Sequence, residues 1–126
     1  MSTPKSELYV ITSAKKLAGY VLDLTEKCPK KFRYSYLVRI EECCLSIVSL
    51  LYEANDIKLG NFLRSEKQSD VKTKLRILDF LSEEAMKHGC FLLHQYEVIS
   101  SYLYDCSHAL EKWVISDQKR IEAGLQ

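Results

Sequence analysis

The chain has 126 residues, with 18 Lys and Arg against 17 Asp and Glu and a net charge of +1. This length allows one domain to bury a core without disulfides or metal, and the charge balance excludes both a polyanion-coating protein and a strongly acidic one. Four Gly and two Pro are too few for a many-turned β-sandwich or barrel. We therefore expect an all-α protein, with a single domain over residues 1–126.

The first predicted helix covers about residues 5–27. Pro4 suits its first turn after a Ser2 or Thr3 cap, and Pro29 prevents its continuation. Apolar residues at helical spacing line one face: Val10, Ala14, Leu17, Val21 and Leu24. A short basic connection follows.

The second predicted helix covers about residues 33–56 and has the most regular pattern in the chain. Its apolar positions alternate in steps of three and four: Leu37, Ile40, Cys44, Ile47, Leu51 and Ala54. Residues 55–69 contain Gly60 and Asn61 and are predicted to form the longest connection, packed rather than disordered, or else a continuation of this helix.

The third predicted helix begins at a Ser69 or Asp70 cap and ends at His88-Gly89. It spans about five turns. Its apolar positions are Val71, Leu75, Leu78, Leu81 or Ser82, and Ala85.

The fourth predicted helix covers about residues 90–116, and the polar tail 117–126 is expected to be loose or to add a frayed turn. Its apolar positions are Leu92, Tyr96, Ile99, Leu103, Cys106, Leu110 and Trp113. Because two of the three connections are short, neighbouring helices should run antiparallel. The predicted fold is an up-down-up-down four-helix bundle.

Further apolar residues widen these faces: Ile11, Ala18, Leu22, Ile77, Leu81, Leu93 and Val114. A face broader than one core needs predicts a second buried contact, such as a homo-oligomer interface. The alternative is that the bundle uses the whole width for its own core.

The first connection carries a cluster of cations: Lys27, Lys30, Lys31 and Arg33. In an up-down bundle Lys87 lies at the same end, and flexible cations around a helix terminus suit phosphate backbones. Three neighbouring acids could neutralise part of this charge: Glu26, Glu83 and Glu84. The alternative is therefore that this end is only a solvated helix cap.

Aromatic side chains beside these cations are candidates for stacking on bases, and Tyr34 and Tyr36 lie next to the basic connection. Tyr96 and Trp113 occupy apolar positions and are expected in the core. Arg39 is a candidate for a nucleic-acid contact or for an ion pair with Glu42 along the helix.

Catalysis is not expected. The candidate bases are His88, His94 and His108, and the candidate nucleophiles are Cys90 and Cys106. Catalysis would need a base and a nucleophile oriented together in a cleft, and a small bundle offers no evident cleft. Neither Cys-x-x-Cys, His-x-x-x-His nor Glu-x-x-His occurs, so no metal site and no cofactor are expected. Reduced core thiols are predicted at four positions: Cys43, Cys44, Cys90 and Cys106.

The N-terminus has no secretion signal, and no apolar run approaches the roughly 20 residues of a membrane span. A cytoplasmic protein without membrane contact is expected.

Several short segments resemble one family. They are the Leu-Thr-Glu-Lys-x-Pro-Lys turn at 24–30 with Arg33, the second helix from 39 to its Glu-Ala-Asn end at 53–55, and the late Trp113. Together they make nearly the whole chain similar to the accessory variability determinant proteins of diversity-generating retroelements. The chain also resembles the wider four-helix-bundle family encoded in intervening sequences of ribosomal RNA genes.

The resemblance implies a non-catalytic four-helix subunit that forms a ring-like homopentamer and binds the element's reverse transcriptase. It also implies contact with template RNA or cDNA through basic residues during mutagenic retrohoming. The partner-binding candidates are Lys27, Lys30, Lys31, Arg33, Tyr34, Arg39 and Lys87. The near-neutral net charge shifts weight toward protein contacts. The alternative is a bundle of the intervening-sequence type with no reverse transcriptase partner.

Overall fold

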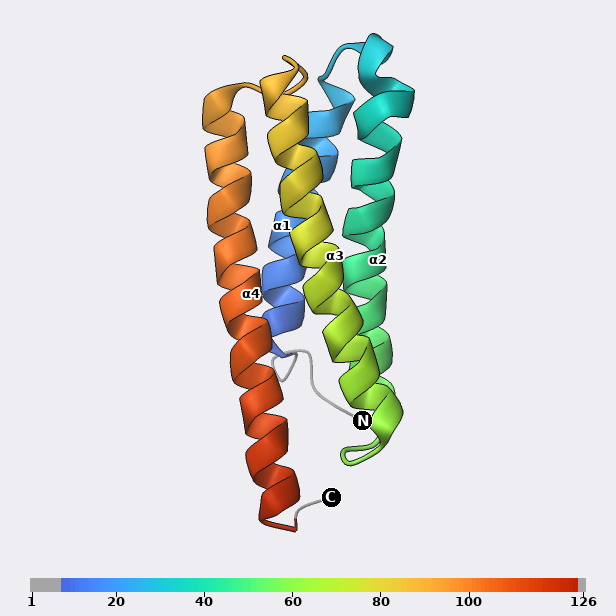
Figure 1. The fold of residues 1–126 in the computed structure, drawn as a ribbon, viewed down its shortest axis with the longest axis vertical. Helices are drawn as coiled ribbons and strands as arrows, with labels where there is room; N and C mark the ends of the chain where they lie inside the picture. The colour runs from blue at the N-terminus through green and yellow to red at the C-terminus, as the bar shows by residue number, and fades with distance from the viewer. Residues whose placement is uncertain (1–7, 125–126) are drawn as a thin grey trace.

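The computed structural model describes residues 8–124, and their regular structure is entirely helical. The four long helices of this range are α1 (Tyr9–Glu26), α2 (Val38–Asp56), α3 (Phe62–Lys87) and α4 (Leu93–Glu122), as Figure 1 shows. Two short elements, η2 (Lys30–Phe32) and η3 (Arg33–Leu37), lie between α1 and α2. The expected all-α class is confirmed.

The helices pack around a common core. Helix α1 contacts α2 and α4, and α3 contacts the same two helices. In Figure 1 the connections α1–α2 and α3–α4 lie at one end, and the connection α2–α3 lies at the other, near the last turns of α4. Two connections far apart in the sequence are therefore spatial neighbours.

The predicted apolar faces supply most of the core. All the predicted positions of the first two helices are buried, as are Val71, Leu75, Leu78 and Ala85 of α3. In α4 the prediction holds from Ile99 to Trp113. Leu92 and Tyr96 are exceptions. Leu92 is 59% exposed because it precedes the helix as its N-cap residue, and Tyr96 is only half-buried. Four free cysteines are buried, as expected: Cys43, Cys44, Cys90 and Cys106.

The predicted ends of the first two helices agree closely with the structure. The predicted start of the first helix at about residue 5 is wrong, because Leu8 is the extended N-cap residue and α1 begins at Tyr9. Helix α1 ends at Glu26 and α2 at Asp56, and η3 joins directly onto α2 as a π-helical turn. The expected Ser2 or Thr3 cap and Pro4 lie outside the described residues.

The long connection predicted over residues 55–69 is wrong. Gly60 has φ of 91° and makes the turn, and the Oδ1 atom of Asn61 accepts a hydrogen bond of 2.9 Å from the backbone N–H of Leu63. A left-handed glycine followed by an Asn cap allows α3 to begin at once. The connection is therefore short, and Ser69 and Asp70 lie inside α3.

The loose tail predicted from Asp117 is also wrong over its first half. Helix α4 continues to Glu122, and the Asp117 side chain is buried. The reason is a charged partner on α3, described below.

The broad apolar faces are used in two ways. Ile11 and Ala18 are buried, so this part of the width belongs to the bundle's own core. Ile77, Leu93 and Val114, in contrast, are exposed on α3 and α4. Among the described helices none is long and apolar enough to cross a membrane.

Candidate functional site

The connection between α1 and α2 presents its cations at one end of the bundle. Pro29 has extended backbone (φ −60°, ψ 137°), and its carbonyl oxygen accepts a hydrogen bond of 3.1 Å from Phe32 N–H. This turn starts η2, and the chain then passes through η3 into α2. We call this connection and the one between α3 and α4 (residues 27–37 and 88–92) the basic end.

Four of the predicted site residues lie here with exposed side chains: Lys27, Lys30, Lys31 and Arg33. None of the four makes an ion pair with any residue between 8 and 124. The Lys31 ammonium lies 5.1 Å from the centroid of the Phe32 ring, a cation–π contact that leaves its charge uncompensated. The cluster is therefore available to an external anion.

Lys87 differs from these four cations. Its ammonium lies 3.9 Å from a carboxylate oxygen of Glu83 and 3.7 Å from one of Glu84, both on its own helix. These exposed pairs are weak, but they neutralise the positive charge locally. Lys87 therefore adds less to the basic end than its position in the sequence suggests.

Two tyrosines of η3 behave differently. Tyr34 is 81% exposed, whereas the Tyr36 hydroxyl lies 3.0 Å from Nδ1 of His88 and the two rings stack at a centroid distance of 5.9 Å. The same His88 nitrogen lies 2.9 Å from the carbonyl oxygen of Glu84. Tyr36 thus links the α1–α2 connection to the α3–α4 connection, whereas the exposed Tyr34 ring is accessible for stacking on a base.

Arg39 lies six residues after Arg33, in the first turn of α2. Its side chain is exposed and makes no ion pair with Glu42 or with another described residue. It extends the exposed positive charge from the basic end onto the first turn of α2.

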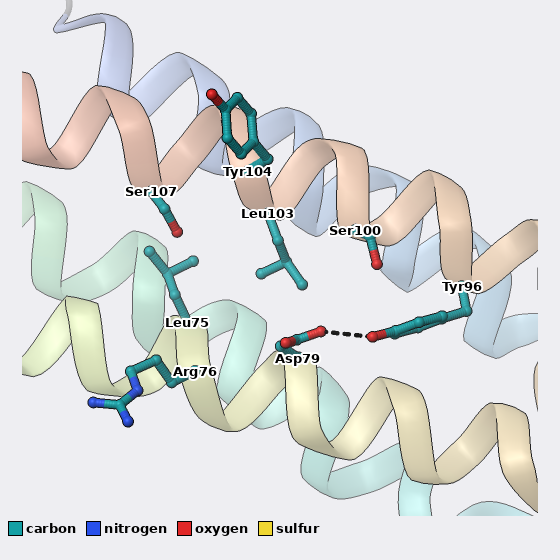
Figure 2. A pocket seen from close by; sticks show the side chains of 8 residues that line it. All are labelled: Leu75, Arg76, Asp79, Tyr96, Ser100, Leu103, Tyr104 and Ser107. Atoms are coloured by element: carbon teal, nitrogen blue, oxygen red, sulfur yellow. Dashed lines mark hydrogen bonds between the residues drawn. The ribbon is translucent and has the colours of Figure 1, made fainter.

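A groove between α3 and α4 is the second concave feature. One cavity of about 350 Å³ is lined by residues of both helices: Leu75, Arg76, Asp79, Tyr96, Ser100, Leu103, Tyr104 and Ser107 (Figure 2). Across it, the Tyr96 hydroxyl donates a hydrogen bond of 2.9 Å to Asp79 Oδ1. Partial burial, with the Asp79 carboxylate nearby, raises the pKa of Tyr96, so the phenol remains a donor at neutral pH.

A neighbouring cavity of about 370 Å³ continues this groove and shares Leu75, Arg76 and Ser107 with the first. Its wall is more apolar, with Leu110 and Val114. Neither cavity is lined by Cys or His. The groove therefore lacks the thiol and imidazole groups that the sequence offered as candidate nucleophiles and bases.

The thiols and imidazoles lie elsewhere. Burial raises the pKa of Cys44, Cys90 and Cys106 to about 12, so these thiols are protonated at neutral pH and are poor nucleophiles. His108 stacks on Tyr104 at the surface, with centroids 6.0 Å apart. Within residues 8–124 no three His, Cys, Asp or Glu side chains are placed to hold a metal ion.

A buried polar cluster at the other end was not predicted. Arg64 of α3 donates two hydrogen bonds to Asp117 of α4, at 2.7 and 2.9 Å, and a third of 3.0 Å to the carbonyl oxygen of Ile57. Gln68 also donates to Asp117, at 2.9 Å, and the guanidinium lies 5.1 Å from the centroid of the Trp113 ring. We call these residues the Arg64 cluster.

The sequence did contain a signal for the Arg64 cluster. Gln68 and Arg64 continue the apolar face of α3 backwards in steps of three and four from Val71, and Asp117 continues that of α4 forwards from Trp113. Polar residues at core positions of two helices indicate a buried pair rather than a connection and a tail.

No known protein-family model matches the chain, and a search of curated proteins found no match.

Proposed function

We propose that this protein is a non-catalytic accessory scaffold that binds a retroelement reverse transcriptase, together with its template RNA or cDNA, during mutagenic retrohoming. The observation that supports this most is the exposed and uncompensated charge of the basic end. Lys30, Lys31 and Arg33 are exposed without a carboxylate partner among the described residues, and the open Tyr34 ring lies beside them. Cations and an aromatic face together suit phosphates and unstacked bases.

The proposal includes an antiparallel up-down-up-down bundle that assembles into a homopentamer in the cytoplasm. Short connections, with two of them at one end, support the helix arrangement. Most of the large exposed apolar side chains lie on α3 and α4, which supports self-association. They are Phe62, Leu63, Ile77, Phe80, Leu93, Tyr104, Val114, Ile115 and Ile121.

Co-purification tests the partner. The tagged chain is expressed with a reverse transcriptase encoded beside its gene, and the captured material is compared before and after nuclease treatment. The triple variant Lys30→Glu/Lys31→Glu/Arg33→Glu should capture at least tenfold less enzyme, because each change replaces an attractive charge with a repulsive one. Recovery that survives nuclease points to a direct protein contact, and recovery that nuclease abolishes points to an RNA bridge.

A matched control carries three charge reversals on exposed lysines elsewhere: Lys72→Glu/Lys112→Glu/Lys119→Glu. It changes the net charge equally and should capture the enzyme as the wild type does. If the wild type captures no reverse transcriptase, the proposal is wrong.

Light scattering on the purified protein tests the assembly. A mass near five chains supports the ring. A monomer or dimer would remove the ring and favour the second candidate, a bundle of the ribosomal RNA intervening-sequence type with no reverse transcriptase partner. The gene neighbourhood separates the two candidates independently, because the second predicts an interrupted ribosomal RNA gene.

A further inference from the structure

Two cysteines from distant parts of the chain lie against one another at the basic end. Cys28 follows α1 and Cys90 follows α3, and both are free thiols. The Cys28 sulfur lies 3.5 Å from the carbonyl oxygen of Cys90, across 62 residues of chain. The Cys28 thiol also lies 3.3 Å from the carbonyl oxygen of Leu24. The two thiols also interact with each other, since the pKa of Cys90 is raised by burial and also by the Cys28 thiol, so the two side chains are neighbours.

The backbone holds Cys90 in place. Gly89 follows the last turn of α3 with φ of 84°. Its N–H donates to the carbonyl oxygen of Met86 at 3.2 Å, and the Cys90 N–H donates to the carbonyl oxygen of Ala85 at 2.8 Å. This is the Schellman arrangement that closes a helix, and it fixes where the next residue points. The contact between Tyr36 and His88 then ties the same connection to η3.

We propose that Cys28 and Cys90 form an intramolecular disulfide when the protein meets a small-molecule disulfide such as oxidised glutathione. The Cys28 thiolate attacks one glutathione sulfur and releases the first reduced glutathione. The Cys90 thiolate then attacks the Cys28 sulfur of this mixed disulfide and releases the second. Two protein thiols become one disulfide, oxidised glutathione becomes two reduced molecules, and each leaving thiolate takes up one of the two thiol protons.

The order of the two attacks follows from access. Cys28 is half-buried and can meet a small molecule, whereas Cys90 is only 6% exposed. Burial raises the pKa of both thiols, to about 12 for Cys90, so the exchange is slow at neutral pH. The pair is therefore a cross-link that forms at equilibrium, unlike a fast peroxide sensor, whose thiol is exposed and has a low pKa.

The other cysteines offer no equivalent pair. Cys43 and Cys44 are adjacent on α2, so their side chains leave the helix about 100° apart. Cys43 instead donates to the carbonyl oxygen of Lys74 at 3.3 Å, and Cys106 is buried in α4. The inference does not depend on the proposed function.

The experiment equilibrates the full chain with a mixture of oxidised and reduced glutathione, quenches it with acid and maps the peptides by mass. We expect one linked pair of peptides containing Cys28 and Cys90, lighter by two hydrogens, with no glutathione retained. The ratio of linked product to glutathione adduct should be at least about tenfold higher in the folded protein than in urea, because folding removes the closure entropy of a long loop.

Variants complete the test. Cys90→Ser, or Cys90→Ala if the serine does not fold, should leave a stable glutathione adduct on Cys28, and Cys28→Ser should leave no link. Cys106→Ser is the matched control and should form the same link as the wild type. A wild-type protein that retains glutathione on Cys28, links other cysteines, forms disulfide-bonded dimers or stays unmodified would overturn the inference.

Discussion

The two ends of the bundle use arginine in opposite ways. At the basic end Arg33 is exposed without a carboxylate partner among residues 8–124, whereas Arg64 at the other end is buried and held by both oxygens of Asp117. Arg64 occupies a core position of α3, where a charge is tolerated only with a partner. Arg33 lies in a turn that faces solvent. The position of an arginine on its helix, rather than its charge, therefore determines whether it stabilises the fold or can bind a partner.

The Arg64 cluster is unusually complete. Asp117 accepts from Arg64 and from Gln68, and the remaining guanidinium nitrogen donates to the carbonyl oxygen of Ile57. The cluster thus joins the α2–α3 connection, α3 and the end of α4. A buried charge whose hydrogen bonds are satisfied costs little as it stands, but removing one partner leaves the other uncompensated.

The largest expected effect follows from removing that partner. Asp117→Ala should lower the free energy of unfolding by about 3–5 kcal/mol, because it leaves the Arg64 guanidinium buried without its carboxylate. Urea denaturation monitored by circular dichroism measures this. The control is Glu53→Ala, which breaks the exposed pair with Lys67 (2.9 Å) and should change stability far less. Equal losses in the two variants would contradict the distinction between a buried and an exposed ion pair.

A double variant sharpens this result. Arg64→Met with Asp117→Leu removes both charges together and should recover most of the stability lost in Asp117→Ala. If the double variant is as unstable as the single one, the loss comes from packing rather than from an unpaired charge.

The raised pKa of a buried thiol predicts a smaller loss of stability between pH 8 and pH 10. Burial raises the pKa of Cys106 from 9.0 to about 12 in the folded state, so the unfolded chain releases this proton first as the pH rises above about 9. Stability therefore falls between pH 9 and 12, by about 1.4 kcal/mol per pH unit for one such thiol. Urea titrations at pH 8 and 10 measure the loss, and Cys106→Ala should reduce it. A loss of the same size in that variant would exclude this thiol as a cause.

The smallest stability effect concerns Ser82, a buried polar group that, unlike Arg64, lacks a partner. Its hydroxyl is buried on the core face of α3 and makes no hydrogen bond within the described part of the chain. Ser82→Ala should raise the free energy of unfolding by about 1 kcal/mol, because it removes an unpaired hydroxyl and favours the helix. Thermal denaturation checks the sign, and a lower melting temperature would indicate that the hydroxyl is satisfied in solution.

The sequence predicted what depends on local spacing. Helix α2 and the core face of α1 follow from apolar residues three and four apart, and both are confirmed. The start of α3 and the end of α4 were missed because Arg64, Gln68 and Asp117 are polar at core positions. Each is recognisable as a core residue only when its partner on another helix is known.

The candidate site divides in the same way. The exposure of Lys30, Lys31 and Tyr34 follows from a polar turn beside Pro29 and could be read from the sequence. The contact of Tyr36 with His88 joins residues 52 apart in the chain, and the contact of Cys28 with Cys90 joins residues 62 apart. No local pattern contains such pairs, because they arise only when the helices pack.

The most direct test of the account measures binding of a single-stranded RNA by fluorescence anisotropy over a series of salt concentrations. The wild type is compared with Lys30→Glu/Lys31→Glu/Arg33→Glu and with the charge-matched control Lys72→Glu/Lys112→Glu/Lys119→Glu. We expect salt-dependent binding by the wild type and by the control. In the basic-end variant, the slope of log K against log salt should be smaller by about 2, for three lost phosphate contacts. No binding by the wild type, or equal slopes in the two triple variants, would contradict it.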